Sequence, residues 1–247
     1  MLEIKNVSKT FNPGTVNAKT ALNGLNLTLN DGDFVTVIGG NGAGKSTMLN
    51  AVAGTIQVDT GSIILDGRDI TRLPEFKRAA YLGRVFQDPM MGTAATMQIE
   101  ENLALADRRG KRRTLHPGIT QADRERYIEQ LKILDLGLEN RMTAKVGLLS
   151  GGQRQALTLL MATLQKPELL LLDEHTAALD PKTAAKVLEA TQRIVEKNRL
   201  TTMMITHNMR DAISYGNRLI MMYEGHVAVD VSGEEKRHLT VEQLLEL

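Results

Sequence analysis

A run of glycines with one lysine and two hydroxyl residues, Gly39 to Thr47, has the composition of a phosphate-binding loop. Gly39 and Gly44 are separated by four residues, and Lys45 and Ser46 follow directly, which is the spacing of loops that wrap around nucleotide phosphates. Glycines allow backbone N–H groups to turn inward toward an anion. We therefore predict a nucleotide site made by Gly39, Gly40, Asn41, Gly42, Ala43, Gly44, Lys45, Ser46 and Thr47.

Two side chains of this loop have expected chemical roles. Lys45 should neutralise charge on the β- and γ-phosphates, and the Ser46 hydroxyl should ligate Mg²⁺. The alternative is a glycine-rich turn with an incidental lysine, and the flanking sequence disfavours it. An apolar, β-rich run over residues 33–38 precedes the loop, and a helical pattern over residues 48–53 follows it. Strand, glycine loop and helix would place the anion at the positive end of the helix.

Two adjacent carboxylates, Asp173 and Glu174, follow a run of leucines over residues 169–172. Such a run is typical of a central parallel strand, and ligands in parallel sheets lie at the carboxyl ends of the strands. We expect Asp173 to be a second Mg²⁺ ligand beside Ser46, and Glu174 to polarise an attacking water. The alternative is an acidic helix cap that follows a strand.

A second anion site is predicted at Leu149 to Gln153, which opens a helical pattern. Ser150 and Gln153 have the spacing of a capping box, which alone would explain both residues. Gly151 and Gly152 directly after the cap also leave backbone N–H groups open to a phosphate.

Three single residues are ambiguous by themselves. Phe11 precedes the glycine loop and could stack on adenine, although an aromatic residue more often packs in a core. Gln87 and His207 stand where the strands predicted over residues 80–86 and 201–206 end. Each is more often a structural or solvent-facing residue, and the alternatives are a place near the metal for Gln87 and a γ-phosphate contact for His207.

The remaining pattern gives the elements that must position these residues. Residues 1–30 and 60–67 read as β-structure, residues 218–223 and 226–231 as a hairpin. Helices are predicted over residues 99–106 and after Thr120, after Asp180 with Pro181 in its first turn, and from Thr240. The basic run of residues 108–113 reads as a solvated loop, with a contact to lipid head groups or an acidic partner as the alternative.

Composition narrows the function classes. The 30 Lys and Arg residues balance 29 Asp and Glu residues, so no basic excess favours a nucleic-acid partner. The chain has no cysteine, which excludes disulfides, thiolate metal sites and a cysteine nucleophile. Residues 1–5 lack the layout of a secretory signal, and no apolar run approaches the ~18 residues that span a bilayer. Any membrane-spanning part is therefore expected to come from other polypeptides.

Over roughly residues 2–230, the order of these segments resembles the ATP-binding subunit of ATP-binding-cassette (ABC) transporters. In the resemblance, Phe11 corresponds to the adenine-stacking aromatic residue, the segment Gly39–Thr47 is the Walker A motif, and Gln87 is the Q-loop residue near the metal. The segment Leu149–Gln153 is the LSGGQ signature, and Leu169–Asp173 is the Walker B motif. Glu174 is the catalytic carboxylate, Asp180 belongs to the D-loop, and His207 is the switch histidine.

The resemblance implies an α/β fold: a P-loop NTPase (RecA-like) core, an antiparallel β subdomain and an inserted helical signature subdomain. It implies one ABC ATPase domain over residues 1–247, with the core and β lobe at about 1–90 and 155–232. The helical subdomain would occupy about 91–154, and a C-terminal helix would occupy 233–247.

The resemblance also implies cofactors and partners. ATP and Mg²⁺ would bind between two copies paired head to tail, because in this family the signature of one cassette closes on the γ-phosphate held by the other. The pair would lie peripherally at the cytoplasmic face of the cell membrane, bound to integral membrane permease subunits and, in an importer, served by an extracytoplasmic solute-binding protein. No nucleic acid is expected.

Two departures from the family pattern stand out: His175 replaces a common proline and Ala177 a common serine. The phrases over residues 83–89 and 174–180 look like a bacterial subgroup of tryptophan/tyrosine or amino-acid uptake systems. We therefore predict an amino-acid importer that hydrolyses ATP. The alternatives are an exporter, a cassette serving DNA repair or ribosome rescue, and a nucleotide-sensing regulator without turnover.

Overall fold

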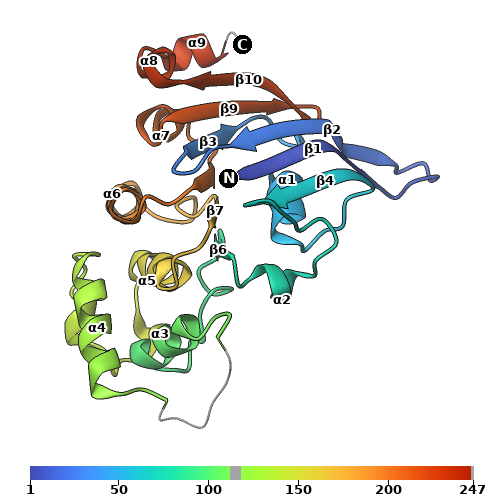
Figure 1. The fold of residues 1–247 in the computed structure, drawn as a ribbon. Helices are drawn as coiled ribbons and strands as arrows, with labels where there is room; N and C mark the ends of the chain where they lie inside the picture. The colour runs from blue at the N-terminus through green and yellow to red at the C-terminus, as the bar shows by residue number, and fades with distance from the viewer. Residues whose placement is uncertain (112–117, 246–247) are drawn as a thin grey trace.

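The computed structural model describes residues 1–111 and 118–245, whose strands form two sheets (Figure 1). The antiparallel sheet has the order β2-β1-β4-β5. Its strands are β1 (Leu2–Phe11), β2 (Lys19–Leu29), β4 (Thr60–Leu65) and β5 (Arg68–Asp69). The antiparallel β-structure predicted for the first 30 residues is thus confirmed.

The second sheet has the order β10-β9-β3-β8-β7-β6, and its strands are parallel except β10, which runs antiparallel to β9. Because the parallel strands point the same way, the carboxyl ends of β3, β6, β7 and β8 meet at one edge. These strands are β3 (Phe34–Ile38), β6 (Leu82–Val85), β7 (Leu169–Asp173), β8 (Thr202–Ile205), β9 (Arg218–Tyr223) and β10 (His226–Ser232).

The helices surround this second sheet, with α3 and α4 far from the antiparallel sheet and α8 and α9 beside β10 (Figure 1). They are α1 (Lys45–Ala53), α2 (Glu75–Arg78), α3 (Ile99–Asp107), α4 (Gln121–Lys132), α5 (Gly151–Thr163), α6 (Pro181–Asn198), α7 (Met209–Ser214), α8 (Gly233–Arg237) and α9 (Val241–Leu245). Two 3₁₀ turns lie at Leu138–Asn140 and Val146–Leu148.

The parallel sheet separates two hydrophobic clusters. Leu169 and Leu171 face the cluster that includes α1 and the antiparallel sheet, whereas Leu170 and Leu172 face the cluster that includes α5 and α6. Successive side chains of a strand point to opposite faces, so a strand buried on both faces must be apolar throughout. This explains the unbroken leucine run of β7 and places Asp173, its last residue, and the following Glu174 at the sheet edge.

The predicted helix starts are confirmed at three places. Thr120 accepts a hydrogen bond from the Asp123 amide at the start of α4, and Ser150 accepts one from the Gln153 amide at the start of α5. Asp180 caps α6 through the Thr183 amide at 3.1 Å. Polar side chains here replace the missing partners of the first helical N–H groups.

Three short helices, α2, α7 and α8, are absent from the sequence-based expectation, which placed one terminal helix where α8 and α9 both occur. They contain four to six residues each, too few for a helical period to stand out.

The structure differs from the solvated loop expected for residues 108–113 at Arg109. Arg109 is not a solvated loop residue, because its guanidinium donates to the carbonyls of Ala162 and Gln165 at the end of α5. Arg112 and Arg113 lie outside the described residues.

One buried cation fixes the helix that follows the glycine loop. Arg78 is 1% exposed, and its guanidinium donates to the carbonyls of Ala51 and Val52 at 2.7 and 2.8 Å, at the end of α1. The same side chain bonds the carbonyls of Leu73 and Thr71. A cation at a helix C-terminus satisfies orphan carbonyls and complements the helix dipole. Arg78 therefore anchors α1 at the end opposite to the glycine loop.

Lys236 of α8 is a second buried cation, and its pKa leads to a testable prediction. It is 2% exposed and donates to the carbonyls of Tyr215 and Gly216 behind α7. Burial lowers the pKa of Lys236 to about 8, from 10.5. Between these values the unfolded chain binds more protons than the folded chain, so stability should rise with pH. The full shift corresponds to about 3 kcal/mol.

Urea unfolding of the wild type and Lys236→Met at pH 7.5 and pH 10 measures this effect. The wild type should gain stability relative to the variant as the pH rises, since methionine does not titrate. A difference between the two proteins that stays constant with pH would contradict the lowered pKa.

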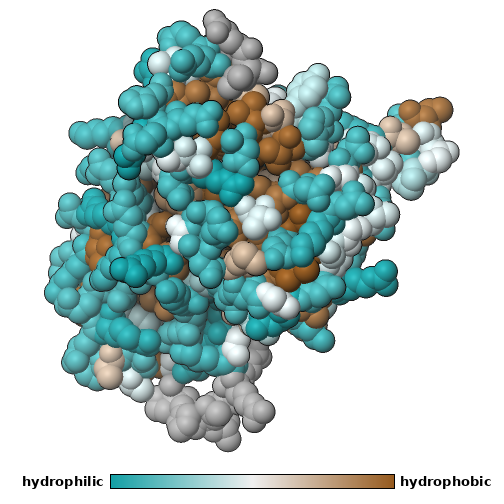
Figure 2. Space-filling model, turned by 45° about the horizontal axis from the view of Figure 1, so that its top comes forward, coloured by the Kyte–Doolittle hydropathy of each residue, from teal (hydrophilic) through white to brown (hydrophobic). Residues whose placement is uncertain are grey.

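The face shown in Figure 2 is mostly hydrophilic, and its hydrophobic residues lie between the hydrophilic ones and at the tip that projects on the right. The hairpin joining β1 and β2 projects from the body in Figure 1, and Val16 in its loop is fully exposed. None of the described helices is both long enough and apolar enough to cross a lipid bilayer.

Candidate functional site

The glycine loop joins β3 to α1 and leans against two other strands. Gly39 and Gly44 have φ angles of 146° and 101°, a region that favours glycine. A Cβ at Gly39 would collide with the carbonyl oxygen of Met222 in β9, and one at Gly44 with that of Ala21 in β2. The loop can therefore pack this closely only with glycine at both positions, and its shape is set by its neighbours.

Lys45 lies across this loop. Its side chain is buried, and the ammonium donates to the carbonyls of Gly39 and Gly40 at 2.7 and 3.0 Å. The loop itself thus holds a positive charge at the start of α1, where an anion would sit. This is the arrangement that the spacing predicts for a phosphate site.

A cavity of about 290 Å³ opens over the loop and joins residues from distant parts of the chain. It brings together Phe11, most of the glycine loop and Glu174, which is one of the two adjacent carboxylates. Its lining is Phe11, Lys19, Ala21, Asn41, Gly42, Gly44, Lys45, Ser46, Thr47 and Glu174.

Lys19 was missed by sequence reasoning. A Cβ at Gly42 would lie 3.0 Å from its Nζ, so its ammonium is directly beside the loop. The strand pairing could have indicated this residue. Phe11 of β1 pairs with Lys19 of β2, so a correct hairpin register would have placed both residues at the cavity.

Glu174 lies beside His207, as expected for residues that end neighbouring strands. Its Oε2 is 3.6 Å from His207 Nδ1, and its side chain is 25% exposed against 62% for the histidine. The backbone of Glu174 has a φ of 44°, in the left-handed region that side chains rarely adopt. Such a conformation persists only where the surroundings hold it.

Asp173 and Gln87 line a neighbouring groove of about 690 Å³ rather than the cavity over the loop. Arg84 projects into the same groove from β6, with Nη2 at 2.6 Å from Asn50 Oδ1 and 3.5 Å from Asp173 Oδ2. Burial raises the pKa of Asp173, the Arg84 guanidinium opposes this rise, and Glu174 adds to it. Arg84 was also missed, because no local pattern indicates which strand end an arginine will reach.

The donors around this edge fit Mg²⁺. Within the described ranges, no three His, Asp or Glu side chains gather closely enough to hold a metal by themselves. Mg²⁺ is usually held by one or two carboxylates together with substrate phosphates and waters, so such a cage is not required. The Ser46 hydroxyl in the cavity over the glycine loop is a suitable donor, as are the Asp173 carboxylate and the Gln87 amide in the neighbouring groove.

The second predicted anion site is separate from the first. Ser150, Gly152 and Gln153 line their own cavity of about 240 Å³, together with Lys182 and Lys186 of α6. A Cβ on Gly152 would collide with the Thr183 side chain, so this glycine also lets α5 and α6 pack closely. None of the described glycine-loop residues lines this cavity.

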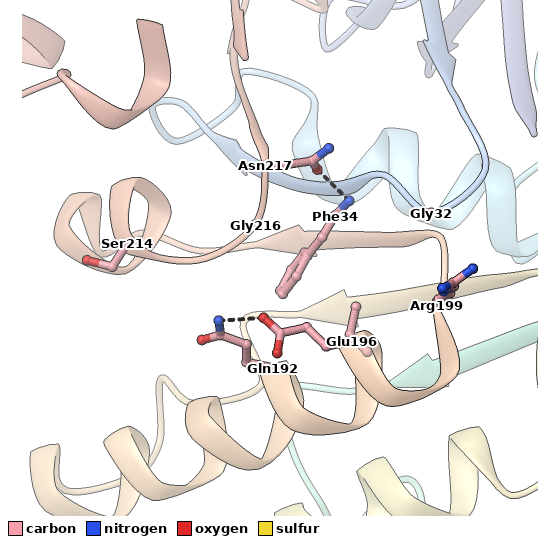
Figure 3. A pocket seen from close by; sticks show the side chains of 9 residues that line it. Gly32, Phe34, Gln192, Glu196, Arg199, Ser214, Gly216 and Asn217 are labelled. Atoms are coloured by element: carbon pink, nitrogen blue, oxygen red, sulfur yellow. Dashed lines mark hydrogen bonds between the residues drawn. The ribbon is translucent and has the colours of Figure 1, made fainter. Parts of the chain in front are cut away.

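Asp180 lies outside all of these cavities and caps α6, and its hydrogen bonds to Thr183 lower its pKa. A further cavity of about 500 Å³ lies at the opposite end of β3, lined by Phe34, Gln192 and Glu196 among others (Figure 3). It contains none of the predicted site residues.

A strand, glycine loop and helix with a lysine on the loop and a carboxylate across the cavity define a P-loop nucleotide-binding protein. The sequence matches the family described as ABC transporter over residues 22–177. The chain belongs to the ABC transporter family and is an ATP-binding cassette that hydrolyses ATP.

Individual relatives agree with this assignment. The chain is 47% identical to a tyrosine transport ATP-binding protein of Clostridioides difficile, over 100% of this chain and 98% of that protein. It is 34% identical to the spermidine/putrescine import ATP-binding protein PotA of Haemophilus influenzae, over 95% of this chain, but spans only 59% of PotA.

Solved structures confirm the predicted α/β cassette fold. A dimeric post-hydrolysis state of the ATP-binding cassette MJ0796, bound to ADP and Pi, is 30% identical, with a TM-score of 0.79 over 94% of this chain and 98% of that chain. The fold of cbiO1 from Clostridium perfringens, at 24% identity, matches with a TM-score of 0.81 over 99% of this chain and 92% of that chain.

Proposed function

We propose that this cassette powers the import of an amino acid, with tyrosine as the first candidate. The observation that carries the proposal is the 47% identity, over the whole chain, to a tyrosine transport ATP-binding protein. PotA and the methionine import protein MetN of Corynebacterium diphtheriae, 35% identical over 92% of this chain, are also named as importers.

Several residues that line the cavity over the glycine loop, and His207 beside it, have proposed roles. Phe11 stacks on adenine, while the loop amides and Lys45 hold the β- and γ-phosphates. Glu174 orients and polarises the attacking water, and His207, 3.6 Å from its carboxylate, contacts the γ-phosphate.

Ser46 and Asp173 would hold Mg²⁺, with Gln87 nearby. The bound ion would neutralise charge that develops on the phosphates.

Two copies are required for a complete site in this proposal. The cavity at Ser150 to Gln153 has a helix N-terminus and two nearby lysines, which suit a phosphate, yet it lies apart from the glycine loop of the same chain. Head-to-tail pairing would bring the signature of one copy to the γ-phosphate bound by the other. Asp180, at the start of α6, would lie at this interface.

The groove lined by Gln87 and Asp173 is the proposed link to the membrane. Its lining includes residues of α1 and β6 and the segment after β6, which ends at the exposed Met91, the first residue of the helical region that we assign to about residues 91–154. Permease subunits docked here would move when the two cassettes close on ATP, and hydrolysis would reset the open state. The protein would then lie peripherally at the cytoplasmic face of the cell membrane.

Affinity purification from the native host tests the transport proposal. We would tag the chain, solubilise the membranes in detergent and identify the bound proteins by mass spectrometry, with the untagged strain as control. A polytopic protein together with a solute-binding lipoprotein is the expected result, and tyrosine uptake by the reconstituted complex would support the cargo. Recovery of soluble or nucleic-acid partners alone would overturn transport and leave ATP hydrolysis unaffected.

A further inference from the structure

The residue after the proposed catalytic carboxylate, His175, is anchored in the protein interior. It is 2% exposed, and its Nε2 lies 3.1 Å from Oγ1 of Thr191, which is 1% exposed on α6. The polar contact therefore ties the chain directly after Glu174 to the middle of α6.

The direction of this hydrogen bond follows from the donors available. The Thr191 hydroxyl has one hydrogen, and it donates to the carbonyl of Val187 at 2.8 Å. Thr191 Oγ1 can then only accept from His175, so Nε2 must carry the proton.

Glu174 needs such an anchor because its backbone is strained. Its φ of 44° costs a side-chain-bearing residue free energy that the surroundings must supply. Two backbone hydrogen bonds contribute, from the Glu174 amide to the Ile205 carbonyl at 3.1 Å and from the Ala177 amide to the Glu174 carbonyl at 3.0 Å. The hydrogen bond of the His175 side chain is a third attachment. It fixes the residue directly after Glu174, and so it restricts the direction of the backbone at Glu174.

We propose that His175, through Thr191, is a positioning residue for Glu174 that holds its carboxylate at the cavity over the glycine loop. This inference rests on the proposed role of Glu174 in polarising water. Loss of the anchor would let the backbone relax and displace the carboxylate, which slows the chemical step without removing any group that binds ATP.

Single-turnover hydrolysis of MgATP by the purified chain tests the proposal. Thr191→Val keeps the shape and removes the acceptor, and should lower the rate about tenfold to a hundredfold with unchanged nucleotide affinity. Thr191→Ser keeps the hydroxyl and should restore most of the rate. Thr163→Val is the matched control, because that buried hydroxyl also donates to a carbonyl one turn earlier, at 2.9 Å, on α5.

A double-mutant cycle separates this inference from the role of Glu174 itself. In a Glu174→Gln background, Thr191→Val should cause no further loss, because the group that it positions is already gone. An equal loss in both backgrounds, or a fall in affinity as large as the fall in rate, would overturn the positioning role. Full activity of Glu174→Gln alone would instead overturn the proposed function of Glu174.

The histidine provides a second pair of variants if Thr191→Val fails to fold, which a thermal melt would reveal. His175→Gln can present an amide N–H near the position of Nε2 and should retain more of the rate than His175→Leu. Equal rates for these two variants would overturn the proposal.

Discussion

Glu174→Gln should lower the ATP turnover rate by about 10²- to 10⁴-fold while nucleotide affinity remains near that of the wild type. Glutamine keeps the size of the side chain and its reach toward His207, but it cannot accept a proton from water. Because binding is retained and hydrolysis is blocked, the variant should accumulate as an ATP-bound dimer. Phosphate release measures the rate, and size-exclusion chromatography with and without MgATP measures the dimer.

Glu168→Gln is a suitable control for this variant. Glu168 lies just before β7, at the end of the strand far from Glu174. It forms a surface ion pair with Arg68 at 3.3 Å, and such a pair contributes ~1 kcal/mol or less to stability. It should turn over ATP at the wild-type rate. Turnover by Glu174→Gln at that same rate would remove Glu174 from the proposed chemistry.

Lys45→Ala should weaken ATP binding about 10- to 100-fold. A charge-assisted hydrogen bond of this kind contributes roughly 1.5–3 kcal/mol. The substitution also removes the bonds from Nζ to the Gly39 and Gly40 carbonyls, so the empty loop should become less ordered. Isothermal titration calorimetry with ATP measures the affinity. The same titration with AMP tests whether the lost affinity comes from the β- and γ-phosphates.

The loss should be confined to the phosphates that Lys45 contacts. AMP lacks the β- and γ-phosphates, so its affinity should change far less than that of ATP. Lys197→Ala, an exposed lysine in the last turn of α6, should bind both nucleotides normally. Unchanged ATP affinity in Lys45→Ala would count against the phosphate-site assignment.

The sequence predicts the elements of this fold well wherever local chemistry sets their ends. Asp180 with Pro181 starts α6, Ser150 with Gln153 starts α5, and the leucine run of β7 is bounded by charged residues. Each signal lies within a few neighbouring residues, so no tertiary information is needed. The edge of the sheet that gathers Ser46, Glu174 and His207 follows from the parallel strand order of such folds.

Contacts between distant elements could not be predicted in the same way. Arg84 reaches Asp173, Arg78 reaches the end of α1, and Lys236 reaches the end of α7, each across a separation that pattern analysis does not span. All three are cations with largely buried side chains. From sequence alone, a long basic side chain is normally expected to lie in solvent. His175 belongs with them, since its place after the two carboxylates is visible in the sequence but its partner on α6 is not.

The separation between the glycine-loop cavity and the Ser150 cavity has a genetic consequence. In the proposed pair, each chain contributes one half to each of two composite sites, so two different defective alleles can complement each other. A chain defective in Lys45, paired with a chain defective in its Ser150 to Gln153 signature, would place both lesions in one composite site and leave the other site intact. Neither allele expressed alone would assemble an undamaged site, whereas the mixed pair would retain one.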